Sequence, residues 1–513
     1  MSGQTTMLMA IDVGTSFIKT FVYDLSGVCV ANAIAPVNDE RPSAGIFLQR
    51  GDEIFDSVVS AMKSICQSLG EKAGNIEAII FSGQMAGFMG VDGEWNDITT
   101  WSCSLDTRYV PYADKQISAY GKTFTNLSGT GVPQMAPKFE WFKNEFPDLD
   151  KKICKYLMIS GYVLGRLGTL DANDAVMDIT FSTWTGLADI GKREWSEEIC
   201  NMIGLDRNRL PRIVDSNCIC SHLSKEMAEH IGLKAGVPLV SGAGDKIASC
   251  IGSAIVEPGD VNFEASSYGA IHVCVSDFRP DESYDCIPSP IPGEFYLTKY
   301  LAGSGITIDW FMNTFYCDNE EKLSDAFKRI ERQISDIPPG SDGLMGIGLL
   351  AGNAFPLDGT TRGMWLGFDW SHRQEHFYKA FLESYAYEFA ITFDKVKEKY
   401  PELKFKPVYA LGGGAKSYEW MQINADVTGM EYKAINRDDT AAWGAAILAG
   451  NAIGAFPDIR EKAKSSIKTI RDYDPVEERH AKYKDYKELY IEFLHYMKHG
   501  FNKLEALKSK YNQ

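Results

Sequence analysis

Several features are scarce or missing in this 513-residue chain, and each absence excludes a class of protein. No hydrophobic run has the length of a membrane span, since the apolar stretch near the start ends at Ile11. Met1 to Met7 carries no basic residue, so we expect no signal peptide. Basic residues number 52 against 69 acidic ones, and the net charge of -17 argues against nucleic acid and membranes as partners.

Three common ligand-binding patterns are also incomplete. Gly121-Lys122-Thr123 lacks the earlier glycine that a P-loop requires. The run 346–351 matches a dinucleotide-binding glycine pattern without a leading βαβ unit, which leaves a NAD-dependent oxidoreductase as an alternative. Cys218, Cys220 and His222 lie close together, but no second ligand pair follows at zinc-site spacing. We therefore expect the eleven cysteines to be reduced thiols of a cytoplasmic protein.

The length indicates more than one domain. Short β-rich runs at the start predict a meander of strands, followed by a helix over Asp52 to Leu69. After Gly259 the pattern restarts with strands, so we predict domains 1–253 and 254–513, a duplicated α/β architecture around a central cleft. The segment from about residue 475 to 513 predicts an exposed helix that packs by one face.

Asp245 is the first candidate for chemistry. It follows the predicted buried strand Val237 to Ser241 and the small residues 242–244, so its carboxylate should emerge at the carboxyl end of that strand. There it can accept a proton from a hydroxyl group and orient that group for attack on a phosphoryl group. The alternative is that Asp245 caps the helix that begins near Lys246.

Two further segments favour a nucleotide site. Asp12 precedes Gly14, Thr15 and Ser16, and a carboxylate beside small donors suits Mg²⁺ and phosphate. The glycines 412–414 follow a predicted strand and remove every side chain between the backbone and a base or ribose. Plain turns are the alternative for both segments.

Taken in order, these segments resemble the motifs of the FGGY carbohydrate kinases. The matching runs are Asp12-Val13-Gly14-Thr15-Ser16, Ser82-Gly83-Gln84-Met85, Ala136-Pro137-Lys138-Phe139-Glu140-Trp141, Gly242-Ala243-Gly244-Asp245, Gly412-Gly413-Gly414-Ala415-Lys416-Ser417, Ala425-Asp426-Val427-Thr428-Gly429 and Ala441-Ala442-Trp443-Gly444-Ala445-Ala446. The resemblance covers about residues 8–450. It implies the two-domain α/β fold of the actin and hexokinase superfamily, which is ribonuclease H-like and closes over ATP and a sugar.

The resemblance also implies residue roles, with ATP, Mg²⁺ and a sugar as ligands. Asp245 would be the catalytic base and, with Asp12, a magnesium ligand. The sugar would meet Gln84, Met85, Asp106, Arg108 and Lys246. The nucleotide would meet Gly14, Thr15, Ser16, Ser267, Gly269, Gly305, Gly412, Gly413, Gly414 and Asn424. A homodimer is one option for the assembly.

The chain departs from the xylulokinases, the subgroup that its Ser-Gly-Gln-Met motif most resembles. Ala86 stands where they usually have His, Lys246 where they usually have Asn, and 266–269 reads Ser-Ser-Tyr-Gly instead of Gly-Thr-Ser-Gly. We expect Lys246 either to favour an anionic substrate or to lower the pKa of Asp245. The prediction is a xylulokinase-like, ATP-dependent sugar kinase. The alternatives are a kinase of another sugar, a sugar acid or a linear signalling-type sugar, and a catalytically weak nucleotide-binding regulatory protein.

Overall fold

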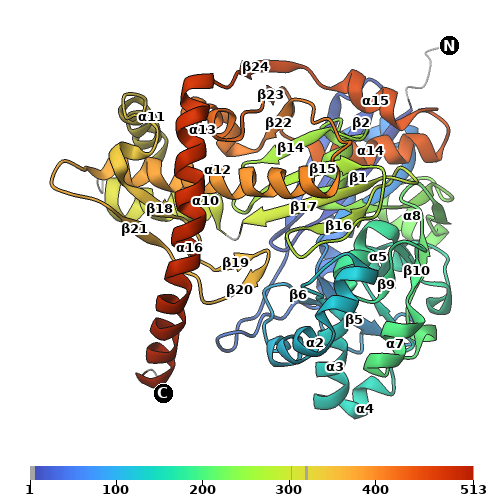
Figure 1. Cartoon of the computed structure of the whole chain (residues 1–513). Coiled ribbons are helices and arrows are strands. Elements are labelled where there is room, and N and C mark those ends of the chain that lie inside the picture. The colour runs from blue at the N-terminus through green and yellow to red at the C-terminus, as the bar shows by residue number, and fades with distance from the viewer. Residues whose placement is uncertain (1–5, 302, 318–321, 512–513) are drawn as a thin grey trace.

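Two large mixed sheets form the centre of the molecule (Figure 1). The computed structural model describes residues 6–301, 303–317 and 322–511. The first sheet has the order β12 (Ile219–His222), β13 (Pro238–Gly244), β4 (Ile76–Gly83), β1 (Met7–Val13), β2 (Phe17–Asp24) and β3 (Cys29–Pro36). The second has the order β16 (Asp285–Pro288), β17 (Phe295–Leu301), β15 (Gly269–Val275), β14 (Val261–Glu264), β22 (Val408–Leu411), β23 (Tyr432–Ile435) and β24 (Thr469–Tyr473).

The two sheets repeat one topology. In the first, β1 is antiparallel to β2 and parallel to β4, which is in turn parallel to β13. In the second, β14 is antiparallel to β15 and parallel to β22, which is in turn parallel to β23. The predicted duplicated α/β fold is therefore confirmed, and so is the meander of strands at the start of the chain.

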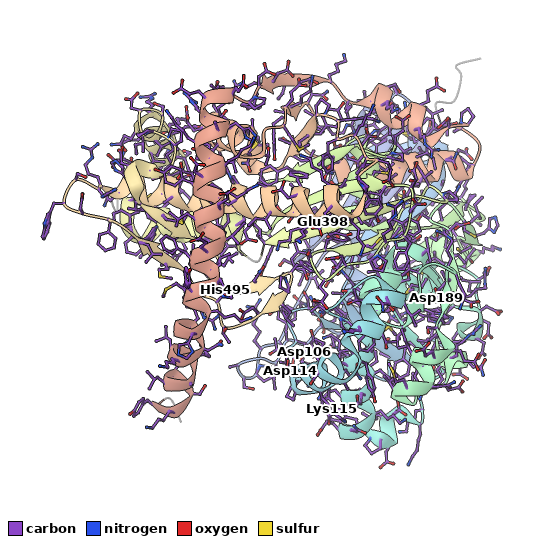
Figure 2. All side chains as sticks on the ribbon, viewed as in Figure 1. Asp106, Asp114, Lys115, Asp189, Glu398 and His495 are labelled. Carbon is purple, nitrogen blue, oxygen red and sulfur yellow. The ribbon has the colours of Figure 1, made fainter. Side chains whose placement is uncertain are left out.

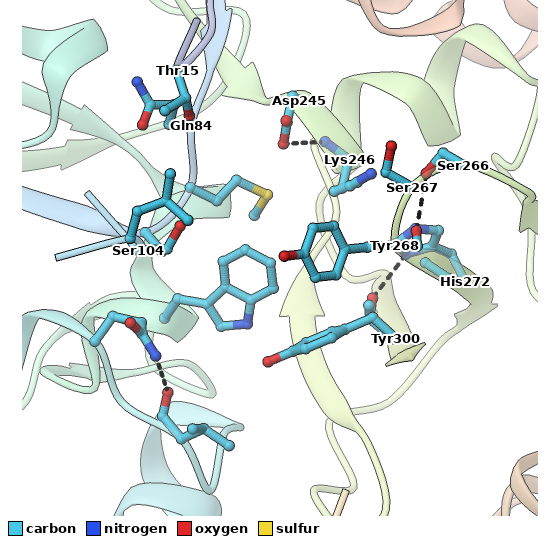
Figure 3. Close-up of a pocket in the computed structure, with 18 of the residues that line it drawn as sticks. Thr15, Gln84, Ser104, Asp245, Lys246, Ser266, Ser267, Tyr268, His272 and Tyr300 are labelled. Atoms are coloured by element: carbon cyan, nitrogen blue, oxygen red, sulfur yellow. Dashed lines mark hydrogen bonds between the residues drawn. The ribbon is translucent and has the colours of Figure 1, made fainter. Parts of the chain in front are cut away.

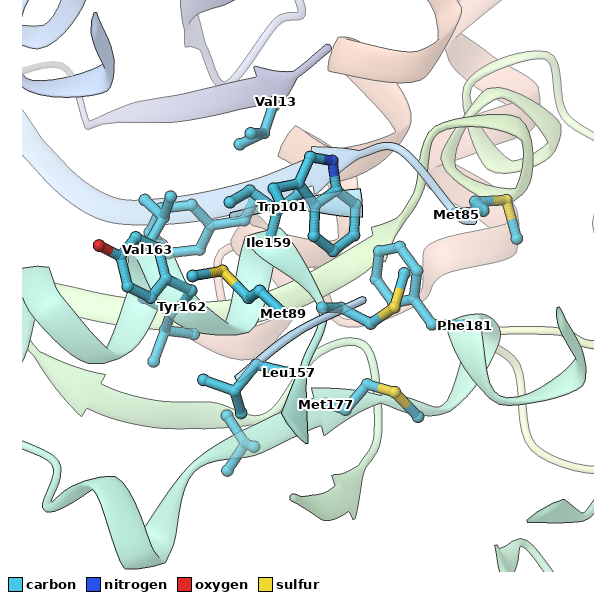
Figure 4. Packing of buried hydrophobic residues seen from close by; sticks show 14 of the residues in the cluster. Val13, Met85, Met89, Trp101, Leu157, Ile159, Tyr162, Val163, Met177 and Phe181 are labelled. Atoms are coloured by element: carbon cyan, nitrogen blue, oxygen red, sulfur yellow. The ribbon is translucent and has the colours of Figure 1, made fainter. Parts of the chain in front are cut away.

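Burial explains why these segments form central strands. β1 and β4 are nearly continuous apolar runs, as expected for strands covered on both faces, whereas β3 at the sheet edge alternates between exposed and partly buried positions. Helix α1 (Gly51–Leu69) packs on β2 and β3, close to its predicted bounds. Figure 4 shows the buried cluster of the first half, including Trp101 and Met85 beside the strand ends that carry the site.

The two halves are joined by a close helix crossing. Helix α9 (Asp245–Gly252) follows β13, and helix α14 (Thr440–Ala452) comes from the second half but packs on α9, β1 and β4. Gly252 and Gly444 lie at the crossing, where a Cβ atom on either would overlap the backbone of the other helix. A division at residue 253 assigns the strands of each sheet to a separate half. Helix α14, however, follows this division and still packs on the first half, so the domain boundary stays a prediction.

Several remaining sequence interpretations are resolved by the fold. The run 346–351 lies in β18 (Met345–Ile347), which pairs antiparallel with β21 (Met364–Leu366) and leads into a turn instead of a helix, so the dinucleotide-binding alternative is wrong. In the described part of the chain, no group of three or more His, Cys, Asp or Glu side chains is arranged to hold a metal, and no helix has the length and apolar character of a membrane span.

The predicted terminal helix is confirmed as α16 (Glu477–Tyr511). Its buried residues are Tyr483, Tyr490 and Phe501, and its far end extends away from the body of the molecule (Figure 1). Residues 512 and 513 of the predicted segment lie outside the described residues, as does residue 302.

Candidate active site

The parallel strands β1, β4 and β13 end at one edge of the first sheet and bring the predicted site together. Asp12 on β1 lies opposite Ser82 on β4, which lies opposite Ala243 on β13. Gly242 permits this arrangement, because its φ of +87° is unfavourable for other residues and a Cβ atom there would overlap Phe81 O. Asp12 and Asp245 therefore lie at the same edge, as predicted for a ligand site.

Asp245 is the first residue of α9 and does not act as its cap. The N-cap is Gly244, which makes no side-chain cap, and Asp245 Oδ1 accepts only the hydrogen bond of the Lys246 amide at 2.7 Å. Burial raises the pKa of Asp245, and the charge of Lys246 lowers it without cancelling that effect. The expectation that Lys246 lowers the pKa of Asp245 is therefore confirmed in direction, although burial keeps this pKa raised, and a raised pKa suits a general base.

The second sheet contributes a carboxylate that sequence reasoning missed. Glu264 ends β14, the strand that corresponds to β1, and so lies where Asp12 lies in the first half. Its Oε1 accepts a hydrogen bond from Lys246 Nζ at 2.7 Å. Burial acts against ionisation of Glu264, but the charge and hydrogen bond of Lys246 outweigh it and hold the pKa below its ordinary value. Comparing the two strand-rich restarts of the sequence would have indicated this residue.

A small polar cavity of about 260 Å³ lies between the two halves at these strand ends. It is lined by Asp12, Lys19, Phe21, Asp245, Lys246, Ser249, Glu264, Asp438, Asp439, Thr440, Ala441 and Ala442. Lys19, also missed in the sequence, faces Asp12 across the β1–β2 hairpin. The five carboxylates outnumber the two lysines, so the cavity suits a cation together with phosphate.

The pair Asp12 and Asp245 fits Mg²⁺. Burial and the charge of Asp245 raise the pKa of Asp12 to about 7. A divalent cation bound by both carboxylates would offset the repulsion by which Asp245 raises the pKa of Asp12. Mg²⁺ is commonly held by one or two carboxylates, with phosphate oxygens and water completing its shell, so a third protein ligand is not required.

A larger cavity of about 550 Å³ opens beside Asp245. Figure 3 shows Thr15, Gln84 and Ser104 from the first half facing Ser266, Ser267, Tyr268, His272 and Tyr300 from the second, with Asp245 and Lys246 between them. Met85, Ala86, Leu105, Tyr109, Val132, Gln134 and Trp184 also line it. Its walls are thus rich in aromatic side chains, with polar groups near Asp245.

Two buried nitrogens of the larger cavity's lining residues lack a protein partner. Gln84 Oε1 accepts from Trp101 Nε1 at 3.2 Å, which leaves Gln84 Nε2 unpaired. His272 Nδ1 bonds Thr298 Oγ1 at 2.9 Å, and its Nε2 is unpaired. Burial lowers the pKa of His272 to about 4, so the ring is neutral at pH 7. Unpaired buried polar atoms beside a cavity are suited to bonds with a ligand.

A third cavity, of about 350 Å³, lies at the ends of β22 and β23. It is lined by Ala410, Leu411, Gly412, Ala415, Lys416, Ala434, Ile435, Asn436, Arg437, Asp438, Ile470, Arg471 and Tyr473. Gly412 is the predicted nucleotide residue that lines it. Asn436, Arg437 and Arg471 were not predicted, because they reach this position from separate strands and loops.

Comparison with known proteins decides the family. A model of the FGGY family of carbohydrate kinases matches residues 7–252 with its N-terminal domain and residues 269–453 with its C-terminal domain. The chain belongs to this family. It is accordingly a phosphotransferase that uses an alcohol group as acceptor. The family and fold predictions are confirmed.

Individual relatives of this FGGY kinase are distant. A xylulose kinase of Bacillus subtilis (strain 168) is 26% identical over 492 residues, covering 94% of this chain and 95% of the relative. A gluconokinase of the same strain is 25% identical over 496 residues, covering 95% of each chain. The crystal structure of a gluconate kinase from Lactobacillus acidophilus superposes with a TM-score of 0.89 at 22% identity, covering 98% of this chain and 100% of that one, and shows the shared fold.

Asp106 and Arg108, predicted to meet the sugar, do not line the larger cavity of this FGGY kinase. Asp106, labelled in Figure 2, is 1% exposed. Its carboxylate accepts from Arg108 Nε at 2.9 Å, Arg108 Nη2 at 2.7 Å and Ser102 Oγ at 2.8 Å. Burial lowers the pKa of the neighbouring Lys138 to about 8. The tight turn after β6 (Ser102–Cys103) directs Asp106 into this network and away from the cavity.

Asp106→Ala is therefore expected to reduce stability more than sugar binding. Removal of one member of a buried ion pair costs about 3–5 kcal/mol, and Arg108 would lose its carboxylate partner. Denaturant unfolding should show this loss. The control is Asp114→Ala on helix α2 (Val110–Thr123), where Asp114 is exposed. A raised sugar KM with unchanged stability would instead support the predicted contact between Asp106 and the sugar.

The predicted nucleotide residues fall into three groups. Gly412 lines the third cavity, and Thr15 and Ser267 line the larger one. Gly305 N–H donates to Ser266 O at 3.2 Å, and Gly269 packs on Ser304, so both support the loop that carries Ser267. Gly14 and Ser16 lie in the β1–β2 turn with Thr15, and Gly413 in the turn after Gly412, and none of the three lines a described cavity.

Asn424 and Gly414, also predicted to meet the nucleotide, lie against other protein groups. Asn424 is fully buried in helix α13 (Tyr418–Thr428), donates from Nδ2 to Trp420 O at 2.7 Å and lines none of the three cavities. Gly414 packs against the Trp420 ring, where a Cβ atom would overlap the indole. Both positions therefore pack against Trp420 and do not line the third cavity.

Proposed function

We propose that this FGGY kinase transfers the γ-phosphoryl group of ATP to a hydroxyl group of a ketose or related polyol. The observation that carries the proposal is that Asp245 and Lys246 line both the larger cavity and the small polar cavity. A base at this junction can reach an acceptor on one side and a phosphate chain on the other. The third cavity, with Gly412, would hold the adenosine.

The residues then act in sequence. The acceptor lies in the larger cavity with its hydroxyl group at Asp245, which takes the proton as the oxygen attacks the γ-phosphorus in line. Lys19 and the turns that carry Thr15 and Ser267 hold the phosphates. Mg²⁺ held by Asp12 and Asp245 would neutralise charge on the phosphate oxygens. Closure of the two halves would exclude water and limit ATP hydrolysis.

The charge of the residues that line the larger cavity bears on whether the acceptor is a neutral sugar or a sugar acid. Lys246 is the one cationic side chain among the residues that line the larger cavity, and Glu264 already neutralises it. A sugar acid would add a carboxylate to a site whose one lysine is already paired with Glu264, so the proposal favours neutral ketoses and polyols.

D-xylulose is not expected to be the best acceptor. Ala86 lines the larger cavity and provides no imidazole donor. A missing hydrogen bond in a buried site costs roughly 1–3 kcal/mol, or about one to two decades in kcat/KM. A coupled ADP-release screen over ketopentoses, polyols, sugar acids and linear diols tests this, with Ala86→His expected to improve D-xylulose selectively. A clear margin for D-xylulose in the wild type would contradict it.

A catalytically weak regulatory protein is the second candidate. The presence of both Asp12 and Asp245 at the strand ends supports turnover over this alternative. ATP binding without ADP release across the whole screen would favour it instead.

We also propose a cytoplasmic location and keep a homodimer as the option for assembly. None of the eleven cysteines, all of which lie in the described part of the chain, forms a disulfide bond, which supports a reducing compartment. Light scattering coupled to gel filtration measures the assembly directly.

A further inference from the structure

The ion pair between Lys246 and Glu264 lies where the two halves and two cavities meet. Lys246 comes from helix α9, next to the first sheet, and Glu264 from strand β14 of the second sheet. Their atoms Nζ and Oε1 are 2.7 Å apart, and the side chains are 28% and 18% exposed. Lys246 lines both the larger and the small cavity, as Asp245 does. An ammonium group is thus held beside the base at the point where a phosphoryl group would pass.

The pair is not saturated with hydrogen bonds. Lys246 Nζ has three N–H donors, of which one is used by Glu264 in the described structure. Among the described residues, no hydrogen-bond partner reaches the buried atoms Glu264 Oε2 and His272 Nε2. A cross-link that served stability alone would be expected to satisfy these buried groups. The remaining donors of Lys246 are therefore available to a ligand in either cavity.

Both members of the pair are charged. Burial opposes the charge of Lys246, but Glu264 and Asp245 outweigh it and raise the lysine pKa. The same contact lowers the pKa of Glu264. Charged groups fixed in a site that excludes water stabilise developing charge without reorganisation.

We propose that Lys246 is a catalytic residue whose ammonium group contacts the phosphoryl group in transfer, and that Glu264 is the positioning residue that holds it there. The inference rests on the proposed kinase function and deepens it. This proposal replaces the sequence prediction that Lys246 contacts the sugar.

The step balances without any further reactant. The acceptor oxygen forms the new bond to the γ-phosphorus as the bond from that phosphorus to the β–γ bridging oxygen breaks, and the electron pair of that bond leaves with ADP. The acceptor proton passes to Asp245. Lys246 neither gains nor loses a proton, and its charge lies near the equatorial oxygens, where negative charge is spread in the transition state.

Three variants separate catalysis from substrate binding. Lys246→Met is expected to lower kcat by about 10²–10³-fold, the loss typical of one preorganised charge-stabilising donor, with KM for the best acceptor changed less than about threefold. Lys246→Arg should recover part of kcat, because the guanidinium group keeps the charge in another shape. Glu264→Gln should lower kcat by about tenfold, since it keeps a hydrogen-bond acceptor but loses the charge that fixes the ammonium group.

The control is Lys406→Met, which removes another lysine that pairs with carboxylates. Lys406 Nζ lies 2.9 Å from Glu257 and 2.8 Å from Asp260, and Lys406 lines neither the larger nor the small cavity. Its kcat should match the wild type. If Lys246→Met raised the acceptor KM tenfold and left kcat unchanged, the proposal would be overturned. Lys246 would then be a residue that contacts the sugar. A lowered melting temperature with kcat within threefold of the wild type would reduce the pair to a structural cross-link.

A second measurement needs no acceptor. If Lys246→Met folds poorly, the binding affinities of Lys246→Arg and Glu264→Gln can be compared with the wild type instead. Calorimetry measures the affinity for MgADP with and without aluminium fluoride, which mimics the phosphoryl group in transfer. Fluoride should tighten MgADP binding in the wild type, and Lys246→Met should lose at least about 30-fold of that gain while binding MgADP alone normally. Tightening that persists in Lys246→Met contradicts this inference alone. No tightening in the wild type contradicts the proposed function as well.

Discussion

Asp245→Asn is expected to lower kcat by about 10²–10⁴-fold, the range for loss of a general base. The carboxamide keeps the shape of the side chain and its bond from the Lys246 amide, but it cannot take the proton of the acceptor. Affinity for ATP, measured by calorimetry, should stay close to that of the wild type. Turnover near the wild-type value with the best acceptor would remove Asp245 from the role of base.

The pH profile gives the same assignment a second check. Burial raises the pKa of Asp245, and a base must be ionised to accept a proton. Activity should therefore fall on the acid side at a pH above that at which an exposed Asp titrates. Lys246→Met should move this limb further toward high pH, because it removes the cation that lowers the pKa of Asp245. Lys406→Met should leave the limb unchanged.

Asp12→Asn is expected to raise the Mg²⁺ concentration required for half-maximal activity by at least about 10–100-fold, the loss seen even for outer-shell partners of a metal. The pKa of Asp12 in the metal-free protein is about 7, and Mg²⁺ binding requires the ionised form. Mg²⁺ affinity of the wild type should therefore increase as the pH rises through 7. Asp12→Asn should remove this pH dependence, and an unchanged Mg²⁺ requirement would exclude Asp12 as a ligand.

The raised pKa of Asp12 also predicts how stability depends on pH. Between its ordinary value of 3.8 and about 7, the folded chain binds a proton at Asp12 that the unfolded chain has released. The free energy of unfolding contributed by Asp12 should consequently decrease as the pH rises through this window. Asp12→Asn should flatten that part of the profile, and MgATP should restore stability at pH 8, since the ligand stabilises the ionised carboxylate.

Local sequence patterns predicted the scaffold of the site well. A carboxylate after an apolar strand, followed by small residues, needs only neighbouring chain to form, and Asp12 and Asp245 both lie at the strand ends where that pattern places them. Asp106 and Arg108 show the limit of such patterns. Their spacing is compatible with a sugar contact or with a mutual ion pair. In the structure Arg108 and Ser102 donate to the Asp106 carboxylate and Lys138 donates to the Asp106 backbone oxygen, and these contacts favour the ion pair.

The sequence by itself determined the family, the duplicated α/β architecture and the position of the two carboxylates that we propose for catalysis and metal binding, because short-range periodicity and ordered motifs carry that information. Only the tertiary structure decided that Glu264 neutralises Lys246, that Lys19 faces Asp12, and that α14 of the second half closes against α9. These contacts join residues far apart in the chain or on facing strands. The Lys246–Glu264 and α14–α9 contacts depend on how the two sheets pack, and the Lys19–Asp12 pairing depends on the register of the β1–β2 hairpin; no local pattern of residues encodes either.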